Sequence, residues 1–102
     1  MRAIYKKPGA YPDTIEIDNT LETLQMKVGG PIEMVTLSPD TCVICNEEGR
    51  IRRMAPNVTL DGINFVGPIL VVGTDREEFC SLKFIGFWMD VIRNNMSWGG
   101  RP

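Results

Sequence analysis

The chain has 102 residues, a formal net charge of −2, 43% hydrophobic and 24% charged residues, and no histidine. This size and composition predict a single soluble domain that can bury one hydrophobic core. The slightly acidic balance disfavours a general binder of nucleic acids or membrane surfaces. The missing histidine excludes Ser-His and Cys-His relays and imidazole metal ligands.

The sequence also indicates a compartment. No apolar run approaches the roughly 18 residues of a transmembrane helix, and residues 1–6 lack the apolar stretch of a signal peptide. Three cysteines, an odd number, do not make a disulfide framework. We therefore expect a cytoplasmic protein with no membrane and no nucleic-acid partner.

The first predicted elements form a hairpin. Residues 2–6 predict a strand, and in residues 14–17 Ile15 and Ile17 alternate with polar residues, as in a half-buried strand. We expect the two strands to pair across the loop 8–13.

A helix is predicted next. Asn19 stands at the expected N-cap, Glu22 follows at capping-box spacing, and Gly29-Gly30 supplies a stop signal. Leu21, Leu24 and Val28 recur at helical spacing and predict one face packed on the sheet.

The middle of the chain predicts a hairpin around a buried strand. Residues 32–37 predict a third strand, and residues 38–40 a turn. The apolar run Cys42–Cys45 lies between turn residues, which predicts a strand buried on both faces. Residues 46–49 then turn the chain, and Arg50–Arg53 is expected to return as a further strand.

The last part predicts a loop, a strand and a helix. Residues 54–62 contain Pro56 and Asp61-Gly62 and predict a loop, and residues 69–73 a second strand that is apolar on both faces. Ser81 is expected to cap a helix from Leu82 to about Asn95. The apolar residues of this helix span roughly 220° of its circumference, whereas packing on one sheet needs an arc of about 100° or somewhat more.

Together these elements predict an α+β fold. We expect a small mixed or antiparallel sheet of about five strands and two helices, the second C-terminal. Residues 1–95 form the single predicted domain, and residues 96–102 are expected to be a flexible C-terminal tail.

The chain also resembles a known family. The resemblance rests on three segments in order: EIDNTLETLQMKVGGPIEMV (Glu16–Val35), ICNEEGRIRRMAPN (Ile44–Asn57) and VGPILVVGTDREEFCSL (Val66–Leu82). They are similar to the domain of unknown function 3846 family, found in phages, plasmids and other mobile elements. The resemblance implies a protein of such an element in the host-cell cytoplasm, and it implies no activity. Arginine here holds the family's lysine-rich position after the Glu-Glu-Gly turn, and the last helix is more hydrophobic than is usual in the family.

Arg50, Arg52 and Arg53 form the candidate ligand-binding site. In an extended strand Arg50 and Arg52 project to the same face about 6.6 Å apart. That spacing suits the phosphate or carboxylate of a small anionic ligand such as a nucleotide, and Asn57 adds an amide nearby. The alternative is that the arginines form surface salt bridges with Glu47, Glu48 or Glu33.

Phe84, Phe87, Trp88 and Val91 are the candidate interface residues. They belong to the wide apolar arc of the last helix, and contiguous exposed apolar patches are uncommon on soluble monomers. We expect a second copy or a host protein to cover them, so the chain is predicted to be a homo-oligomer.

The cysteines and carboxylates predict no catalytic or metal site. Cys42 and Cys45 match C-x-x-C, but residues three apart in a strand point to opposite faces. With Cys80 they form an incomplete zinc set without histidine. The acidic pairs at 47–48 and 77–78 lie in predicted turns, and nothing in the sequence desolvates them for acid–base work. We expect reduced thiols and no cofactor.

The sequence therefore favours a non-enzymatic binding module of a phage or mobile element, which sequesters a small anionic ligand in counter-defence. The alternative is a protein–protein interaction module that inhibits a host protein through its hydrophobic last helix. A small enzyme using carboxylate chemistry is the least favoured function.

Overall fold

The structure, a computed structural model, describes residues 1–96. Its centre is a six-stranded antiparallel sheet of order β2-β1-β7-β4-β3, with β8 paired to β7. A separate two-stranded sheet contains β5 and β6. The α+β class, the antiparallel sheet and the C-terminal second helix are confirmed. The elements are β1 (Arg2–Lys6), β2 (Asp13–Glu16), α1 (Leu21–Val28), β3 (Ile32–Ser38), β4 (Thr41–Asn46), β5 (Pro56–Leu60), β6 (Ile63–Val66), β7 (Ile69–Asp75), β8 (Glu78–Cys80) and α2 (Ile85–Arg93).

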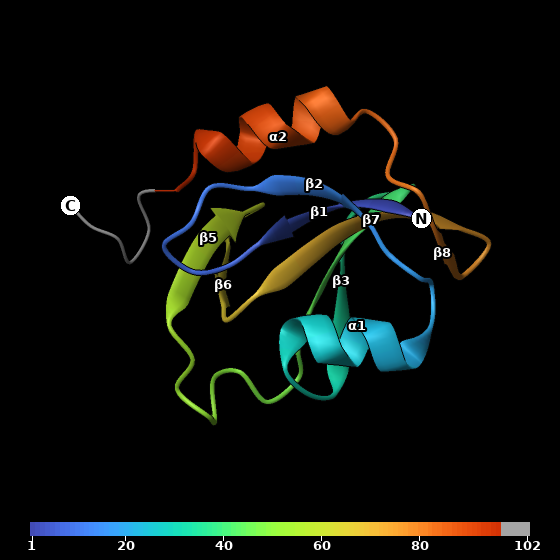
Figure 1. Cartoon of the computed structure of the whole chain (residues 1–102). Coiled ribbons are helices and arrows are strands. Elements are labelled where there is room, and N and C mark those ends of the chain that lie inside the picture. The colour runs from blue at the N-terminus through green and yellow to red at the C-terminus, as the bar shows by residue number, and fades with distance from the viewer. Residues whose placement is uncertain (97–102) are drawn as a thin grey trace.

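The main sheet separates two apolar clusters. Helix α1 covers one face, and α2 lies across the opposite face, which the β5–β6 hairpin also covers (Figure 1). On the first face Leu24 and Val28 of α1 meet side chains of the central strands. The expectation that Leu21 lies on the same face is wrong: at the start of the helix its side chain is 58% exposed. On the second face Ile92 of α2 is fully buried with Val58 and Phe65 of the hairpin. Burial of both faces makes β4 and β7 continuous apolar runs, as expected for strands covered on both sides.

Both the first hairpin and the first helix are confirmed. Strands β1 and β2 pair with Ala3 opposite Ile15. Helix α1 ends at Gly29, whose φ of 84° suits glycine. Its N-cap is Thr20 rather than Asn19, because the Thr20 hydroxyl accepts the Thr23 N–H. The Asn19 side chain instead donates to a carbonyl of β8.

The predicted return strand Arg50–Arg53 is wrong. Residues Glu47 to Arg53 form consecutive turns, in which the Arg52 N–H donates to the Glu48 carbonyl at 2.9 Å. The physical reason is the position of β4 in the sheet, between β7 and β3. Both of its edges are already paired, so no edge is free for a strand that returns directly from β4.

The predicted loop 54–62 is also wrong, since residues 56–62 form β5 and the turn of the β5–β6 hairpin. Asp61 and Gly62 connect the two strands with φ values of 51° and 75°. Positive φ at both turn residues is typical of a type I′ hairpin turn, for which Asp-Gly is a preferred pair. Val58 and Leu60 alternate with Thr59, so the hairpin had a local signal that Pro56 obscured.

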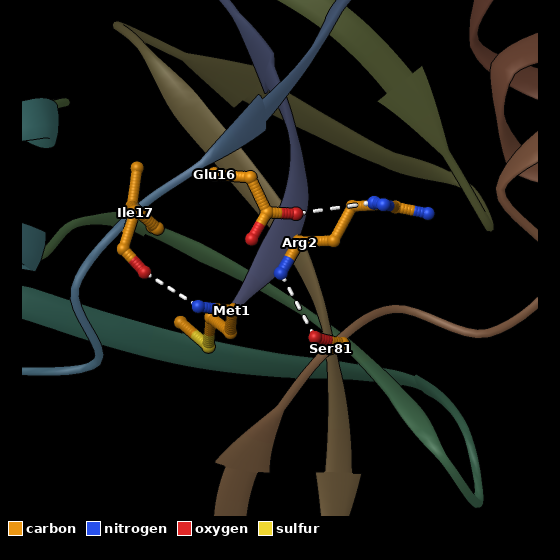
Figure 2. Close-up of polar contacts among 5 residues, drawn as sticks. All are labelled: Met1, Arg2, Glu16, Ile17 and Ser81. Carbon is orange, nitrogen blue, oxygen red and sulfur yellow. Dashed lines mark hydrogen bonds and ion pairs between the residues drawn. The ribbon is translucent and has the colours of Figure 1, made fainter.

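Helix α2 begins at Ile85, three residues later than predicted. The Ser81 hydroxyl accepts the Arg2 N–H at 2.9 Å, and the Leu82 N–H donates to the Arg2 carbonyl. Figure 2 shows Ser81 beside Arg2, whose guanidinium pairs with Glu16 at 3.1 Å. Because the start of β1 holds residues 81 and 82 in place, they do not form the first helical turn.

The end of α2 agrees with the prediction, since Asn94 is its C-cap. Met96 packs against the core cluster beneath α2. The rest of the predicted C-terminal tail, residues 97–102, lies outside the described residues.

The two cysteines of the C-x-x-C motif point to opposite faces, as predicted. Cys42 belongs to the cluster beneath α1, and Cys45 to the cluster on the other face. Burial raises the pKa of Cys42 to about 12, with Cys80 as a second cause, and burial raises the pKa of Cys45 to about 11. Both are therefore buried thiols rather than a redox pair.

We expect thiol-specific reagents to modify half-buried Cys80 first, and Cys42 and Cys45 only on unfolding.

Between pH 9 and about 11 the unfolded chain loses thiol protons that the folded chain keeps. The free energy of unfolding should therefore fall as pH rises through this window. Thiol titration of the native and the unfolded protein measures the order of modification, and denaturant melts at several pH values measure the free energy of unfolding. A Cys42→Ala, Cys45→Ala double variant should lose less stability over the same window, and fast native modification of Cys42 would contradict the assignment.

Candidate binding site

The turn from Glu47 to Arg53 is held by hydrogen bonds at both of its ends. The Asn46 side chain accepts the Glu48 N–H at 2.7 Å, and the Gly49 carbonyl accepts the Met54 N–H at 2.9 Å. An asparagine that bonds the backbone two residues on is a common way to start a turn. The turn is therefore compact, and its side chains do not follow the two-residue periodicity of a strand.

The predicted arginine site is not assembled as expected. The Arg50 guanidinium donates to the Asn64 carbonyl of β6, whereas Arg52 Nη1 donates to the Gly29 carbonyl at 3.0 Å. The two side chains therefore reach different elements. Arg53 is exposed and has a φ of 55°. The alternative of ion pairs with Glu33, Glu47 or Glu48 is not seen for these arginines within residues 1–96 either. The anionic ligand stays a prediction.

Arg52 contributes to the cap at the end of α1. Three successive carbonyls there accept side-chain donors: Lys27 from the Tyr5 hydroxyl at 2.8 Å, Val28 from Asn46 Nδ2 at 3.1 Å, and Gly29 from Arg52. The last carbonyls of a helix lack partners within the helix and carry partial negative charge. A guanidinium at this end is favourable, so Arg52 has a structural role.

Asn57 lies away from the arginines and is only 2% exposed. Its Nδ2 donates to the Lys6 carbonyl at 2.8 Å and to the Gly67 carbonyl at 2.7 Å. Two acceptor partners fix the orientation of the amide. Oδ1 is buried and has no hydrogen-bond partner among the described residues. Asn57 therefore ties the end of β1 to the β5–β6 hairpin and is not placed to contact a ligand together with Arg50.

Lys6 is a second buried polar residue at this point and was not predicted. Its ammonium donates to the Lys7 carbonyl at 3.1 Å, and burial lowers its pKa. Ile4, two residues earlier on β1, belongs to the cluster beneath α2, so Lys6 faces the same side of the sheet. The sequence signal was only the alternation of β1.

A cleft of about 140 Å³ lies beside the turn, over β3 and β4. Its floor and walls are largely apolar, and Ile51 at its edge is 85% exposed. Arg50 reaches this cleft, as do Glu33 and Glu47. The lining residues are Glu33, Val35, Cys45, Asn46, Glu47, Arg50, Ile51, Ile63, Asn64, Phe65 and Val66.

The chemistry of the cleft suits binding better than catalysis. The only thiol in its lining is Cys45, whose pKa of about 11 is raised by burial first and by Glu33 second. At neutral pH this thiol is protonated, and a protonated thiol is a poor nucleophile. The two carboxylates outnumber Arg50, so the cleft does not favour a free anion.

A second hollow, of about 430 Å³, lies at the start of β1 next to α1. Met1, Ile17 and four polar residues line it: Glu16, Asp18, Thr23 and Lys27. The Met1 amine donates to the Ile17 carbonyl at 2.6 Å, as Figure 2 shows. Glu16 and Asp18 are exposed to solvent there, whereas catalytic carboxylates are usually desolvated. We therefore favour the cleft over this hollow.

The described residues offer little for metal or acid–base chemistry. No group of three His, Cys, Asp or Glu side chains in residues 1–96 is placed to hold a metal ion. Glu47, Glu48 and Glu77 are exposed on turns and Glu78 is exposed at the start of β8, whereas catalytic carboxylates are usually desolvated. Neither helix in this part of the chain is long and apolar enough to cross a membrane.

The candidate interface residues divide into two pairs. Trp88 and Val91 are half-buried and pack against the core of their own chain. Phe84 and Phe87 are 71% and 60% exposed. The Phe87 ring meets Trp88 edge-on, with ring centroids 5.0 Å apart. The chain's own core thus leaves only the two phenylalanines of this set uncovered.

The comparison with known families identifies the chain's relatives. Residues 1–91 match the family described as Domain of unknown function (DUF3846). The chain belongs to this family. No curated protein and no solved structure matches it. The match covers every strand in residues 1–96 of this DUF3846 protein and most of α2, so the cleft lies within the family region.

Sequence reasoning missed the cleft in this DUF3846 protein because its lining comes from four separate elements, namely β3, β4, the turn and β6. One signal was available. Ile51 is a single apolar residue between Arg50 and Arg52. In a strand its side chain would face the core, whereas in a turn it can be exposed at the surface. In the turn it points into solvent beside the cleft.

We expect Arg52→Ala to lower the free energy of unfolding by about 1 kcal/mol, because it removes a charged donor at the end of α1. For a domain of this size that corresponds to a melting temperature lower by roughly 4–8 °C. Arg53→Ala is the matched control, since no hydrogen bond or ion pair of the Arg53 side chain is found in residues 1–96. Equal melting temperatures for the two variants would exclude the capping role.

Asn57→Ala should cost about 2–4 kcal/mol, since it removes two buried hydrogen bonds. Asn57→Asp keeps the shape but sets a carboxylate against two carbonyl oxygens, so we expect at least as large a loss at neutral pH. Urea melts measure both variants. If Asn57→Ala unfolds at the same urea concentration as the wild type, the two hydrogen bonds contribute nothing to the free energy of unfolding.

Proposed function

We propose that this chain is a binding module that captures an extended segment of a partner protein along β3, with one apolar side chain in the neighbouring cleft. The observation that carries this proposal is the long, apolar edge strand β3 beside the cleft. Addition of a peptide strand to a free sheet edge is a common mode of peptide recognition. The alternate side chains of the added strand supply specificity.

The backbone groups of β3 that are free for a partner follow from its pairing with β4. The Glu47 N–H donates to the Pro31 carbonyl at 2.8 Å. Hydrogen-bonded and non-hydrogen-bonded pairs alternate in an antiparallel ladder. Glu33 and Val35 therefore direct their N–H and C=O groups toward β4. The groups of Ile32, Met34 and Thr36 point to the outer edge, where the described residues supply no further strand.

The two edges of the main sheet differ in protection. At one edge β2 has four residues, and Asp13, Thr14 and Glu16 are exposed on it. Short, polar edge strands resist further pairing. At the other edge β3 has seven residues and contains neither lysine nor proline, and Met34 is 51% exposed. This edge is the more favourable one for an added strand.

The size of the cleft supports a protein partner. Sites for drug-sized ligands are usually about 300–1,000 Å³, whereas this cleft has about 140 Å³. An apolar cavity of about 150 Å³ holds a molecule the size of benzene, so the cleft matches one aromatic or aliphatic side chain. Glu33 and Glu47 at the cleft favour a basic residue next to that side chain.

The family resemblance supplies the biological setting of this proposal. We propose that the chain is a non-enzymatic accessory protein of a phage or mobile element. It would act in the host cytoplasm, and its partner would be a host protein that it inhibits. This is the alternative function of the sequence analysis, placed at β3 rather than at the last helix.

The anionic ligand is the second candidate. It is supported by the exposed guanidiniums of Arg50, Arg52 and Arg53, for which no ion pair is found in residues 1–96. A nucleotide at 100 times its Kd should stabilise the fold by about 2.7 kcal/mol, a melting shift of roughly 10 °C or more. A nucleotide panel without any such shift would exclude this class of ligand.

The strand-addition proposal can be tested with a displayed library of random peptides selected on the immobilised protein. We expect the selected peptides to carry an apolar anchor beside a basic residue. Met34→Pro removes an outward N–H that the added strand would need, so it should abolish binding. The variant should still fold, because the pairing with β4 is untouched and proline is tolerated at such edge positions. Met34→Ala, which keeps the N–H, is the matched control and should bind nearly as well as wild type.

Amide hydrogen exchange gives an independent measurement. In the free protein Met34 and Thr36 should exchange faster than Glu33 and Val35, and a selected peptide should slow only the first two. Peptides that bind Met34→Pro as tightly as Met34→Ala, or a library that yields no binder, would contradict strand addition.

A further inference from the structure

The outer face of α2 carries an unusual set of residues. Ile92 is fully buried and marks the direction of the core. At 100° per residue, Phe87 and Asp90 lie about 140° and 160° from Ile92, on either side of the outward direction. Gly86 lies about 120° from Ile92. A large aromatic ring, a carboxylate and a glycine therefore share the face that is turned away from the sheet.

Gly86 is not required by the packing of its own chain. A Cβ added there would meet no atom within 4 Å, and the residue does not have the positive φ that favours glycine. Glycine inside a helix lowers helix stability relative to alanine. A glycine on an open helix face allows another chain to approach closely, and this contact would offset the loss of helix stability.

The N-terminal end of α2 is also incomplete. Its N-cap, Phe84, has a φ of 56°, makes no side-chain capping bond, and no acidic residue stands in the first turn. The first N–H groups of a helix carry partial positive charge and favour a nearby carboxylate. Exposed Lys83 directly precedes this end and adds a positive charge.

We propose that a second copy of this chain covers the face, with the two α2 helices packed antiparallel about a two-fold axis between Gly86 and Phe87. Phe87 then lies over Gly86 of the partner subunit, where no side chain obstructs it. Asp90 is 3.5 residues from this axis, about 5 Å along the helix. Lys83 is also 3.5 residues from the axis, in the opposite direction along its own helix, so the two-fold rotation brings Lys83 of the partner subunit, at the uncapped helix end, level with Asp90. A two-fold axis forms each contact twice.

The proposed interface is small. A buried aromatic side chain covers about 150–250 Å², so Phe84 and Phe87 of both subunits supply several hundred Å². Standard stable interfaces bury about 1,200–2,000 Å². We therefore expect a reversible dimer that dissociates on dilution. It is independent of the strand-addition site, because α2 packs over β1 and β5 rather than beside β3.

The Gly86→Gln variant distinguishes an α2 face that is covered by a second copy from one that stays exposed to solvent. The longer side chain has open space in its own chain and favours a helix, so the melting temperature of a dilute sample should stay equal or rise. It blocks Phe87 of the partner subunit, so sedimentation over a concentration series should show the wild type associating and the variant remaining monomeric.

A charge exchange tests the antiparallel register. Lys83→Glu and Asp90→Lys should each weaken dimerisation by roughly tenfold, because each places like charges together twice. The double variant restores opposite charges and should recover most of the wild-type affinity. A wild type that stays monomeric throughout the series, a Gly86→Gln variant that dimerises equally well, or a double variant as weak as the single ones would each overturn the proposal.

Discussion

The fold depends on the double pairing of β4. All six residues of this strand are buried, and it pairs with β3 along one edge and with β7 along the other. A central strand covered on both faces leaves no edge or face for the chain that follows it. The segment after Asn46 must therefore leave the sheet, and it forms the compact turn Glu47–Arg53 before the β5–β6 hairpin crosses the second face. The cleft between the turn, β3 and β6 follows from this exit.

The polar residues around the turn stabilise this arrangement. Asn46 connects three elements, since it starts the turn and donates to the end of α1. Arg52 and Tyr5 bind the neighbouring carbonyls of the same helix end. Asn57 likewise connects the β5–β6 hairpin to β1, because its side-chain amide donates to the Lys6 carbonyl. The carbonyls that Asn46 and Asn57 bind are buried, and a buried carbonyl without a partner would be unfavourable. Residues that suggest a ligand site by type are thus used largely to hold the fold together.

Two of the surfaces outside this network combine exposed apolar side chains with charged ones. The β3 edge with its cleft offers backbone groups and one side-chain site, which suits an extended partner segment. The outer face of α2 offers aromatic rings beside an open glycine, which suits a second helix. The two surfaces lie on different parts of the sheet, so a dimer through α2 would present two β3 edges. If both proposals hold, such a pair of sites would increase the apparent affinity for a partner that contains two matching segments.

The sequence by itself determined the elements whose signals are local. Alternation in Ile15 and Ile17, the Gly29-Gly30 stop and the apolar run from Cys42 to Cys45 each depend on near neighbours in the chain, and each prediction holds. The excess of apolar residues in α2 was likewise readable, and Phe84 and Phe87 are the exposed part of it. Only the tertiary structure decided the sheet order, the fate of Arg50–Arg53 and the partners of Asn57. The Gly29, Asn64 and Gly67 carbonyls that these side chains bind belong to distant segments. Every residue has such a carbonyl, so no residue type in the sequence marks which of them a side chain will reach.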